Sequence, residues 1–305
     1  MERSVKILVT GHSGFIGQHL VPRLEKFYEV IRFESDLLDF KTASQEVLDS
    51  QCDQIVHLAA RTEVEKSFYE PTVFSKINYL GTENLVNAAS KLPNLKNFLF
   101  ASTMEVFGWQ PVSDDIKNGK IPDVMPVYNE TTEPNPNAPY AVAKLACEKY
   151  LQYAHRSKNL PFTALRQTNT YGRKDNNFFV VEQIITQMLN NSDDIYLGYD
   201  TPYRNFLYID DLIDLWCLLV DKYNDVNDGQ IFTIGPNNAV SIDALAKMIA
   251  KKLNWQGTIH WNEKPERDGE IWLLNSDCKT LTERTGWAPK TKLSDGLDKI
   301  IRDLS

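Results

Sequence analysis

The fold is decided by the stretch Val5-Lys-Ile-Leu-Val-Thr10-Gly-His-Ser-Gly-Phe-Ile-Gly17. A β-rich run from Val5 to Val9 leads into a turn with GxxGxxG spacing, and a helical pattern begins at Phe15. Glycine permits a tight turn and lets a pyrophosphate approach the backbone N–H groups at a helix N-terminus. The stretch therefore predicts the opening of a dinucleotide-binding sheet. A simpler interpretation is that the glycines only let the helix pack closely on the strand.

Strand and helix patterns alternate after this turn. Short apolar runs predict strands at 5–9, 29–33, 54–60, 97–102 and 162–165. Apolar residues at helical spacing predict helices at 15–25, 78–90 and 140–157. This alternation favours an α/β fold, in which a doubly wound parallel sheet carries helices on both faces. The run 110–139, rich in Pro, Asp and Asn, predicts a long functional loop at the carboxyl edge of the sheet.

The second half of the chain has a different pattern of predicted elements. Helices at 179–190, 210–223 and 241–253 are joined by short strands and loops. We expect a dinucleotide-binding domain at 1–167. A smaller mixed α/β substrate domain at 168–305 would be interleaved with the sheet.

Composition narrows the class of protein. The 305 residues include 33 Lys and Arg against 41 Asp and Glu, a net charge of −8. An acidic balance argues against a general nucleic-acid partner, and no apolar run approaches the ~20 residues of a membrane span. No export leader is visible, and four scattered cysteines without a CxxC pair fit reduced thiols. Five histidines without HxxxH or HxH spacing predict no metal site, so we expect a cytoplasmic globular protein.

The cofactor preference is read from the end of the second strand. Glu34 can accept hydrogen bonds from both hydroxyls of an adenosine ribose and would repel a 2′-phosphate, which favours NAD over NADP. Arg32 argues the other way, because its guanidinium can serve that phosphate. Asp36 can reach the adenine amine, although an Asp in a loop is also a common turn residue.

Tyr140-Ala-Val-Ala-Lys144 places a phenol and an ammonium four residues apart, on one face of a helix. A neighbouring cation stabilises a phenolate, so we expect Lys144 to lower the pKa of Tyr140 from about 10 toward the working pH. A phenol of lowered pKa is a competent base for a sugar hydroxyl.

Together these segments resemble the extended short-chain dehydrogenase/reductase family, the NAD-dependent nucleotide-sugar epimerases and dehydratases. The resemblance covers nearly the whole chain. It rests on the glycine turn, His57-Leu-Ala-Ala60, Asn78-Tyr-Leu-Gly-Thr82, Ser102-Thr-Met-Glu-Val-Phe-Gly108, Tyr140-Ala-Val-Ala-Lys144, Leu165-Arg-Gln-Thr-Asn-Thr-Tyr-Gly172, Arg204-Asn-Phe-Leu-Tyr-Ile-Asp-Asp211, Arg267-Asp-Gly-Glu270 and Gly286-Trp-Ala-Pro289. The occurrence of all these motifs in the same order is more specific for the family than any single motif.

The resemblance implies site residues. Tyr140 matches the catalytic base, Lys144 its partner and ribose ligand, and Thr103 the hydroxyl that bonds the reacting oxygen. The implied cofactor-binding residues are Gly11, Ser13, Gly14, Phe15, Ile16, Gly17, Glu34, Asp36, Leu37, Leu58, Ala59, Ala60, Asn78, Tyr140 and Lys144. The implied substrate-binding residues are Thr103, Met104, Asn169, Arg204, Arg267 and Glu270. The partner is a nucleoside-diphosphate sugar, which NAD oxidises at C4, and relatives form homodimers through two helices of each subunit.

Glu105 distinguishes the reactions that can follow. A 4-keto group acidifies the C5–H, and Glu105, two residues after Thr103 along an extended segment, would face the same side and take that proton. Dehydratases of the family carry Glu there, whereas many place Asp where this chain has Met104, and a thioether donates no proton.

We therefore expect 4,6-dehydration first, C4 or C5 epimerisation second and decarboxylation of a uronate third. Glu105 as a solvent-facing loop carboxylate remains an alternative. So does a different class, a non-catalytic dinucleotide sensor with the same fold.

Overall fold

The structure is a computed structural model, and it describes residues 4–173, 178–191, 193–262 and 269–305. Its centre is a six-stranded parallel sheet in the order β10-β5-β4-β3-β1-β2. The strands are β1 (Lys6–Thr10), β2 (Glu29–Arg32), β3 (Gln54–His57), β4 (Asn97–Thr103), β5 (Phe162–Gln167) and β10 (Asp228–Ile234). The predicted doubly wound parallel sheet is confirmed.

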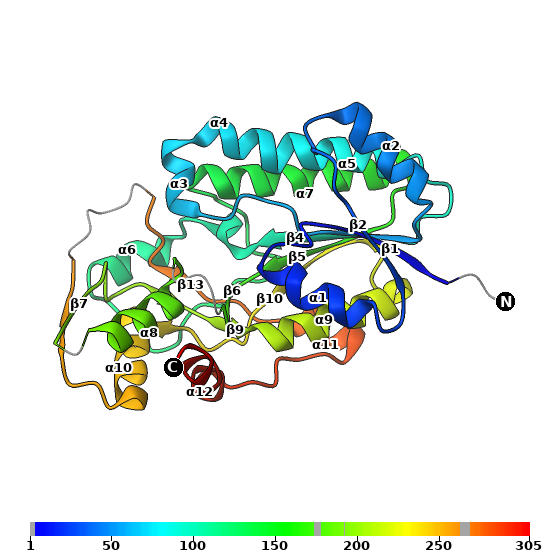
Figure 1. Cartoon of the computed structure of the whole chain (residues 1–305). Helices are drawn as coiled ribbons and strands as arrows, with labels where there is room; N and C mark the ends of the chain where they lie inside the picture. Colours follow the sequence, from blue (N-terminus) through cyan, green and yellow to red (C-terminus); the bar gives the residue numbers. More distant parts are fainter. Residues whose placement is uncertain (1–3, 174–177, 192, 263–268) are drawn as a thin grey trace.

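Helices cover both faces of this sheet (Figure 1). One layer consists of α2 (Phe40–Ser50), α5 (Gly81–Ala89) and α7 (Pro139–Lys158), and the other contains α1 (Phe15–Leu24) and α9 (Ile209–Asp221). Successive side chains of a strand point to opposite faces, so Leu8 packs under the first layer while Ile7 and Val9 pack under the second. Both faces are therefore apolar, as a buried parallel sheet requires.

The glycine turn lies where the strand order reverses. β1 pairs with β2 on one side and with β3 on the other. In such sheets ligands bind in the crevice at the carboxyl ends of the strands, at this switch point. Gly11 has φ +67°, and a Cβ there would lie 2.6 Å from the backbone nitrogen of Ala59. Only glycine allows the turn and the loop after β3 to approach so closely.

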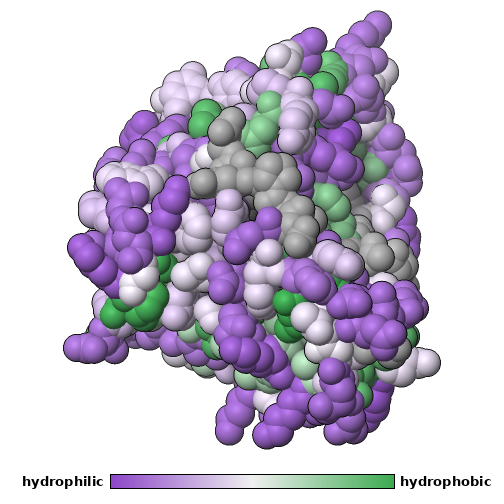
Figure 2. All heavy atoms as spheres, turned by 90° about the vertical axis from the view of Figure 1, so that its left-hand side faces the viewer, coloured by the Kyte–Doolittle hydropathy of each residue, from purple (hydrophilic) through white to green (hydrophobic). Residues whose placement is uncertain are grey.

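The second half of the chain builds three small sheets beside the large one. Their strands are β6 (Asn169–Tyr171), β7 (Asp194–Tyr196), β8 (Tyr203–Arg204), β9 (Phe206–Tyr208), β11 (Val240–Ser241), β12 (Thr258–His260) and β13 (Leu273–Leu274). The helices are α8 (Val180–Asn190), α10 (Ile242–Leu253), α11 (Lys279–Thr285) and α12 (Leu293–Leu304). Figure 2 shows the end of the molecule where α6, α8 and α10 lie, and hydrophilic side chains predominate on that face. Among the described helices, none has the length and apolar character needed to cross a bilayer.

Three segments differ from the sequence-based expectations. The run 110–139 is not all loop, because Pro111–Lys117 forms α6 with a proline in its first turn. The helix expected from residue 78 begins earlier, in α3 (Val64–Tyr69), α4 (Pro71–Phe74) and a π-helical turn, Ser75–Leu80. Helix α2 was not predicted, although Asp39 caps it by accepting hydrogen bonds from the N–H groups of Lys41 and Thr42.

Replacing Gly11 by alanine should lower the free energy of unfolding by about 2–4 kcal/mol, since it adds a backbone clash to an unfavourable φ. Gly286→Ala is the matched control, because Gly286 has φ +75° and no atom within 4 Å of an added Cβ. That variant should cost only about 1 kcal/mol. Urea unfolding measures both, and equal losses would contradict the close approach of Gly11 to Ala59.

Candidate active site

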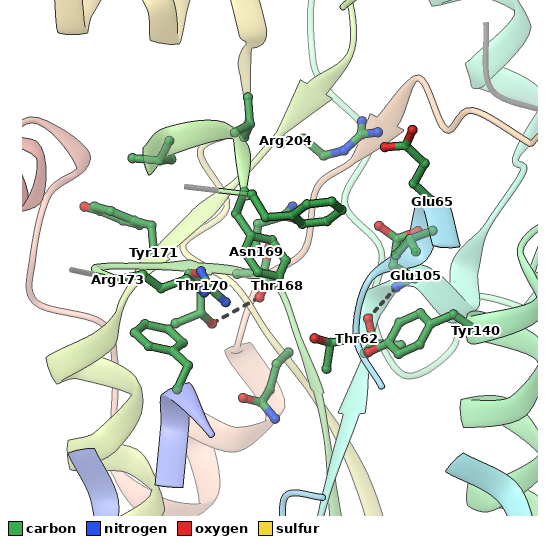
Figure 3. Close-up of a pocket in the computed structure, with 18 of the residues that line it drawn as sticks. Thr62, Glu65, Glu105, Tyr140, Thr168, Asn169, Thr170, Tyr171, Arg173 and Arg204 are labelled. Carbon is green, nitrogen blue, oxygen red and sulfur yellow. Dashed lines mark hydrogen bonds between the residues drawn. The ribbon is translucent and has the colours of Figure 1, made fainter. Parts of the chain in front are cut away.

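A cavity of about 1030 Å³ opens at the carboxyl ends of β1, β4 and β5. The glycine turn forms one wall, and side chains from β6, β8 and the segment before β13 form another. Figure 3 shows Glu105 and Tyr140 entering it from one side and Asn169, Arg204 and Arg173 from the other. Residues far apart in the sequence therefore face one space.

Thr103, Tyr140 and Lys144 meet in this cavity. Thr103 ends β4, and the two other residues lie one turn apart on α7, as their spacing predicts. All three side chains are buried. The Lys144 ammonium donates a hydrogen bond to the carbonyl oxygen of Ala101, Nζ to O 2.7 Å, and lies 4.7 Å from the ring centroid of Phe100. The lysine is thereby fixed to the sheet beneath the tyrosine.

The expectation that Lys144 lowers the pKa of Tyr140 is wrong in this structure. Burial raises the pKa of Tyr140 above its usual value, a hydrogen bond with Thr103 opposes that rise, and the charge of Glu105 adds to it. Burial also lowers the pKa of Lys144 to about 8. Loss of solvation disfavours the charged form of each side chain, and Lys144 is not among the groups that shift the pKa of Tyr140.

Glu105 belongs to a short 3₁₀ helix, Met104–Phe107, and not to the extended segment that the sequence predicts. The Thr103 hydroxyl oxygen caps this helix by accepting a hydrogen bond from the Glu105 N–H at 3.1 Å. Thr103 and Glu105 still line the same cavity. Met104 also lines it, but its side chain is 1 % exposed and packs in an apolar cluster with Phe107 and Trp272.

A buried ion pair behind these residues escaped the sequence analysis. The Arg166 guanidinium binds the Glu148 carboxylate, with Nη2 2.8 Å from Oε2, and the Ser102 hydroxyl donates to Oε1 at 2.5 Å. Glu148 is one turn beyond Lys144 on α7, whereas Ser102 and Arg166 come from β4 and β5. Both charges are almost fully buried, so the helix is tied to the sheet next to Thr103.

The predicted cofactor-binding residues are divided between two cavities that meet at the glycine turn. Those lining the large cavity are Gly11, Ser13, Gly14, Phe15, Ile16, Gly17, Leu58 and Ala60. A second cavity of about 440 Å³ is lined by Glu34, Asp36, Leu37 and Ala59 together with Gly11 and Ser13. The two cavities share the glycine turn, which suits the two ends of one dinucleotide.

The residues around Glu34 bear on the choice of cofactor. Arg32 is engaged elsewhere, because its Nη2 lies 2.6 Å from Oε1 of Glu25. Glu34 lies at the second cavity, with Oε1 3.3 Å from Nε2 of His12 in the glycine turn. Asp36 accepts a hydrogen bond from the Leu38 N–H, so it serves the local turn. The arrangement leaves a carboxylate, and not the Arg32 guanidinium, beside the expected ribose.

Asn78 is the one described residue of the predicted site that lines neither cavity. Its side-chain amide accepts from the Arg61 N–H at 2.8 Å and donates to the Arg61 carbonyl at 2.9 Å. Buried His57 performs a similar task, since its ring nitrogens bond the hydroxyls of Thr10 and Thr82, and burial lowers its pKa to about 3. These neutral contacts fix the loop after β3.

The opposite wall contains the residues expected to bind substrate. Asn169 has a buried side-chain nitrogen with no hydrogen-bond partner in the described part of the chain. Arg204 and Glu270 form an ion pair, Nη2 to Oε1 3.0 Å. Arg267 lies outside the described residues. Asn169 therefore offers a donor that a ligand can satisfy.

The further cavity residues that the sequence analysis missed include Thr62, Glu65 and Arg173. The Arg173 guanidinium lies between two aromatic rings, 4.0 Å from the centroid of Phe15 and 3.8 Å from that of Phe179. Arg173 directly follows the family motif that ends at Gly172, so its position in the sequence could have suggested a role in the site. Its contact with Phe15 in the glycine turn cannot be read from the local sequence. Within the described residues, His, Cys, Asp and Glu side chains form no cluster of three able to hold a metal ion.

Comparison with known proteins places the chain in a family. Residues 7–235 match the model of the NAD dependent epimerase/dehydratase family. A dTDP-D-glucose 4,6-dehydratase of Dictyostelium discoideum is 30% identical over 80% of this chain, which spans 61% of that relative. A putative UDP-glucose 4-epimerase of Methanocaldococcus jannaschii is 27% identical over 97% of both chains.

A solved structure agrees with this assignment. The UDP-glucose 4-epimerase of Thermotoga maritima, determined with UDP-glucose, superimposes with a TM-score of 0.85, 27% identity and 98% coverage of each chain. The chain belongs to the NAD dependent epimerase/dehydratase family. The resemblance drawn from its motifs is thus confirmed.

Glu148→Gln should lower the free energy of unfolding by about 3–5 kcal/mol, because it leaves the buried Arg166 charge uncompensated. Asp228→Asn is the control, since its ion pair with Arg284, Oδ2 to Nη2 2.9 Å, is partly exposed to solvent, with the Asp228 side chain 50% exposed. That variant should cost less than about 1 kcal/mol. Chemical denaturation of the two variants compares them, and equal losses would contradict a special role for the buried pair.

Proposed function

We propose that this protein binds NAD⁺ and a nucleoside-diphosphate sugar, oxidises the sugar at C4 and then eliminates water to give a 4-keto-6-deoxy sugar. The meeting of Thr103, Tyr140, Lys144 and Glu105 in one cavity carries this proposal. Bound NAD⁺ would accept the C4 hydride and later return it to C6. Tyr140 takes the C4 hydroxyl proton, Thr103 hydrogen-bonds the same oxygen, and Lys144 holds the nicotinamide ribose.

The choice of NAD over NADP rests on charge. Glu34 lies at the cavity beyond the glycine turn, while Arg32 is bound to Glu25. A carboxylate accepts hydrogen bonds from ribose hydroxyls and repels a 2′-phosphate.

Glu105 carries the proton through the elimination. Its carboxylate takes the C5 proton and becomes a carboxylic acid, and the same proton then goes to the C6 oxygen that leaves as water. One group serves both steps because Met104 has no proton to give and is packed among apolar side chains. When the hydride returns to C6, C5 takes up one proton from solvent, and Tyr140 releases to solvent the proton that it took from the C4 hydroxyl. The sugar thereby loses one water, and the oxidation state of the cofactor is restored at the end.

C4 epimerisation is the second candidate. Met104 favours it, because dehydration normally benefits from a separate acid at that position, and the relative from M. jannaschii carries an epimerase name. In that reaction the 4-keto sugar returns its hydride on the opposite face and C5–H is untouched.

The product mass decides between these reactions. Purified protein with NAD⁺ is incubated with UDP-, dTDP-, GDP- and CDP-sugars, and each product is weighed by mass spectrometry. Loss of one water supports dehydration. An unchanged mass with an inverted centre indicates epimerisation, and loss of carbon dioxide indicates decarboxylation. If the protein binds NAD but converts none of these nucleotide sugars, a dinucleotide sensor is favoured.

Glu105→Gln should reduce deuterium exchange at C5 in heavy water by at least about 100-fold, since the amide cannot accept the proton. Oxidation at C4, followed as transient reduced cofactor, should persist in this variant. Glu133→Gln, an exposed carboxylate outside both cavities, is the charge-matched control. Unchanged exchange in Glu105→Gln would contradict Glu105 as the base, whereas absence of C5 exchange in the unsubstituted protein would indicate C4 epimerisation. In Tyr140→Phe the C4 oxidation itself should stop while NAD still binds.

We also propose a homodimer through the outer face of α4, α5 and α7, which lie together in Figure 1. Three apolar side chains are exposed on that layer: Val73 on α4, and Val142 and Tyr153 on α7. The small residues Gly81 and Ala141 face inward instead and permit close packing within one chain.

Val142→Glu should shift the protein toward monomer in light scattering after gel filtration, because it places a charge on this face. Val124→Glu, at an 81 % exposed site between α6 and α7, should not. A wild-type monomer at micromolar concentration would overturn the dimer.

A further inference from the structure

Glu65 is an acidic residue of the cavity that no step of the proposed reaction uses. It lies in the first turn of α3 and is half-buried. Figure 3 shows its carboxylate pointing into the cavity from the side on which Glu105 and Tyr140 enter. Within the described part of the chain Glu65 makes no hydrogen bond or ion pair, whereas its neighbours Glu63 and Glu70 pair with Arg61.

The described cations of the cavity already have anionic or aromatic partners. Arg204 is paired with Glu270, and Arg173 lies between two rings with Nη1 3.8 Å from Oε1 of Glu182. Lys144 is bonded to the Ala101 carbonyl. None of these described cations pairs with Glu65, so, among the described residues, the Glu65 carboxylate adds a negative charge without an ion-pair partner to this side of the cavity.

We propose that Glu65 is a specificity residue, which selects a nucleotide sugar with a neutral C6 hydroxymethyl group over the corresponding uronate. The inference rests on the proposed function, because it assigns the sugar to the side of Glu105. A carboxylate accepts hydrogen bonds from sugar hydroxyls, whereas a C6 carboxylate would have to share a partly desolvated space with the like charge of Glu65. The sugar class is thereby narrowed to neutral hexoses.

The test compares binding of UDP-glucose and UDP-glucuronate, which differ only in the oxidation state of C6. Calorimetry is done with NAD⁺ in a Tyr140→Phe background, so that no turnover interferes. With Glu65 present, UDP-glucuronate should bind at least about tenfold more weakly than UDP-glucose, and Glu65→Gln should reduce that ratio by about tenfold. High salt should reduce the ratio in the Glu65 protein and change it less in Glu65→Gln.

Two controls separate charge from disturbance of the fold. Free UDP should bind Glu65→Gln as tightly as it binds the protein with Glu65, because UDP lacks the sugar. Glu283→Gln, on the exposed side of α11, should leave the UDP-glucuronate to UDP-glucose ratio unchanged.

Equal affinity for the two sugars, or an unchanged ratio in Glu65→Gln, would overturn the inference while leaving the proposed function intact. Failure of every nucleotide sugar in the wider panel to bind would instead overturn the proposed function. The two failures are thus distinguishable.

Discussion

The site depends on one buried pair of opposite charges, Glu148 on α7 and Arg166 on β5. Ser102 joins the same carboxylate from β4, next to Thr103. Uncompensated charges are very costly in a protein interior, so the helix has one favourable position against the sheet. Tyr140 and Lys144 project from that helix, and their distance from Thr103 is therefore set by a contact outside the cavity. The rigidity of the site comes from the sheet behind it.

Burial also explains how the proposed base can be selective. In the structure the pKa of Tyr140 is raised by loss of solvent, and Lys144 does not reverse this. A phenol of this kind releases its proton when a further positive charge lies nearby. The ring of oxidised nicotinamide has such a charge, so proton abstraction would be confined to the complex with the oxidised cofactor. Neutral His57 and Asn78 fix the loop after β3 without adding a competing charge.

Two of our proposals concern the same side of the cavity: the reaction that follows oxidation at C4, and the kind of sugar that is bound. Met104 packs in the apolar cluster with Phe107 and Trp272, and in our proposal Glu105 is the group that transfers the proton at C5. Glu65 enters from α3 on the same side. In our proposals the Glu65 carboxylate favours a hydroxymethyl sugar over a uronate, and Glu105 serves the elimination of water.

The sequence alone determined the features that depend on short segments of the chain. The strand, glycine turn and helix at 5–17, the Tyr140–Lys144 spacing and the family motifs are contained in short segments, and the sheet and family they predict are confirmed. The tertiary structure decided the contacts between residues that are far apart in the sequence. Glu148 meets Arg166 from another element, Arg204 meets Glu270 from 66 residues away, and α3 aims Glu65 into the cavity. The pKa of Tyr140 was mispredicted for the same reason, because spacing reveals a neighbouring charge but not the loss of water around it.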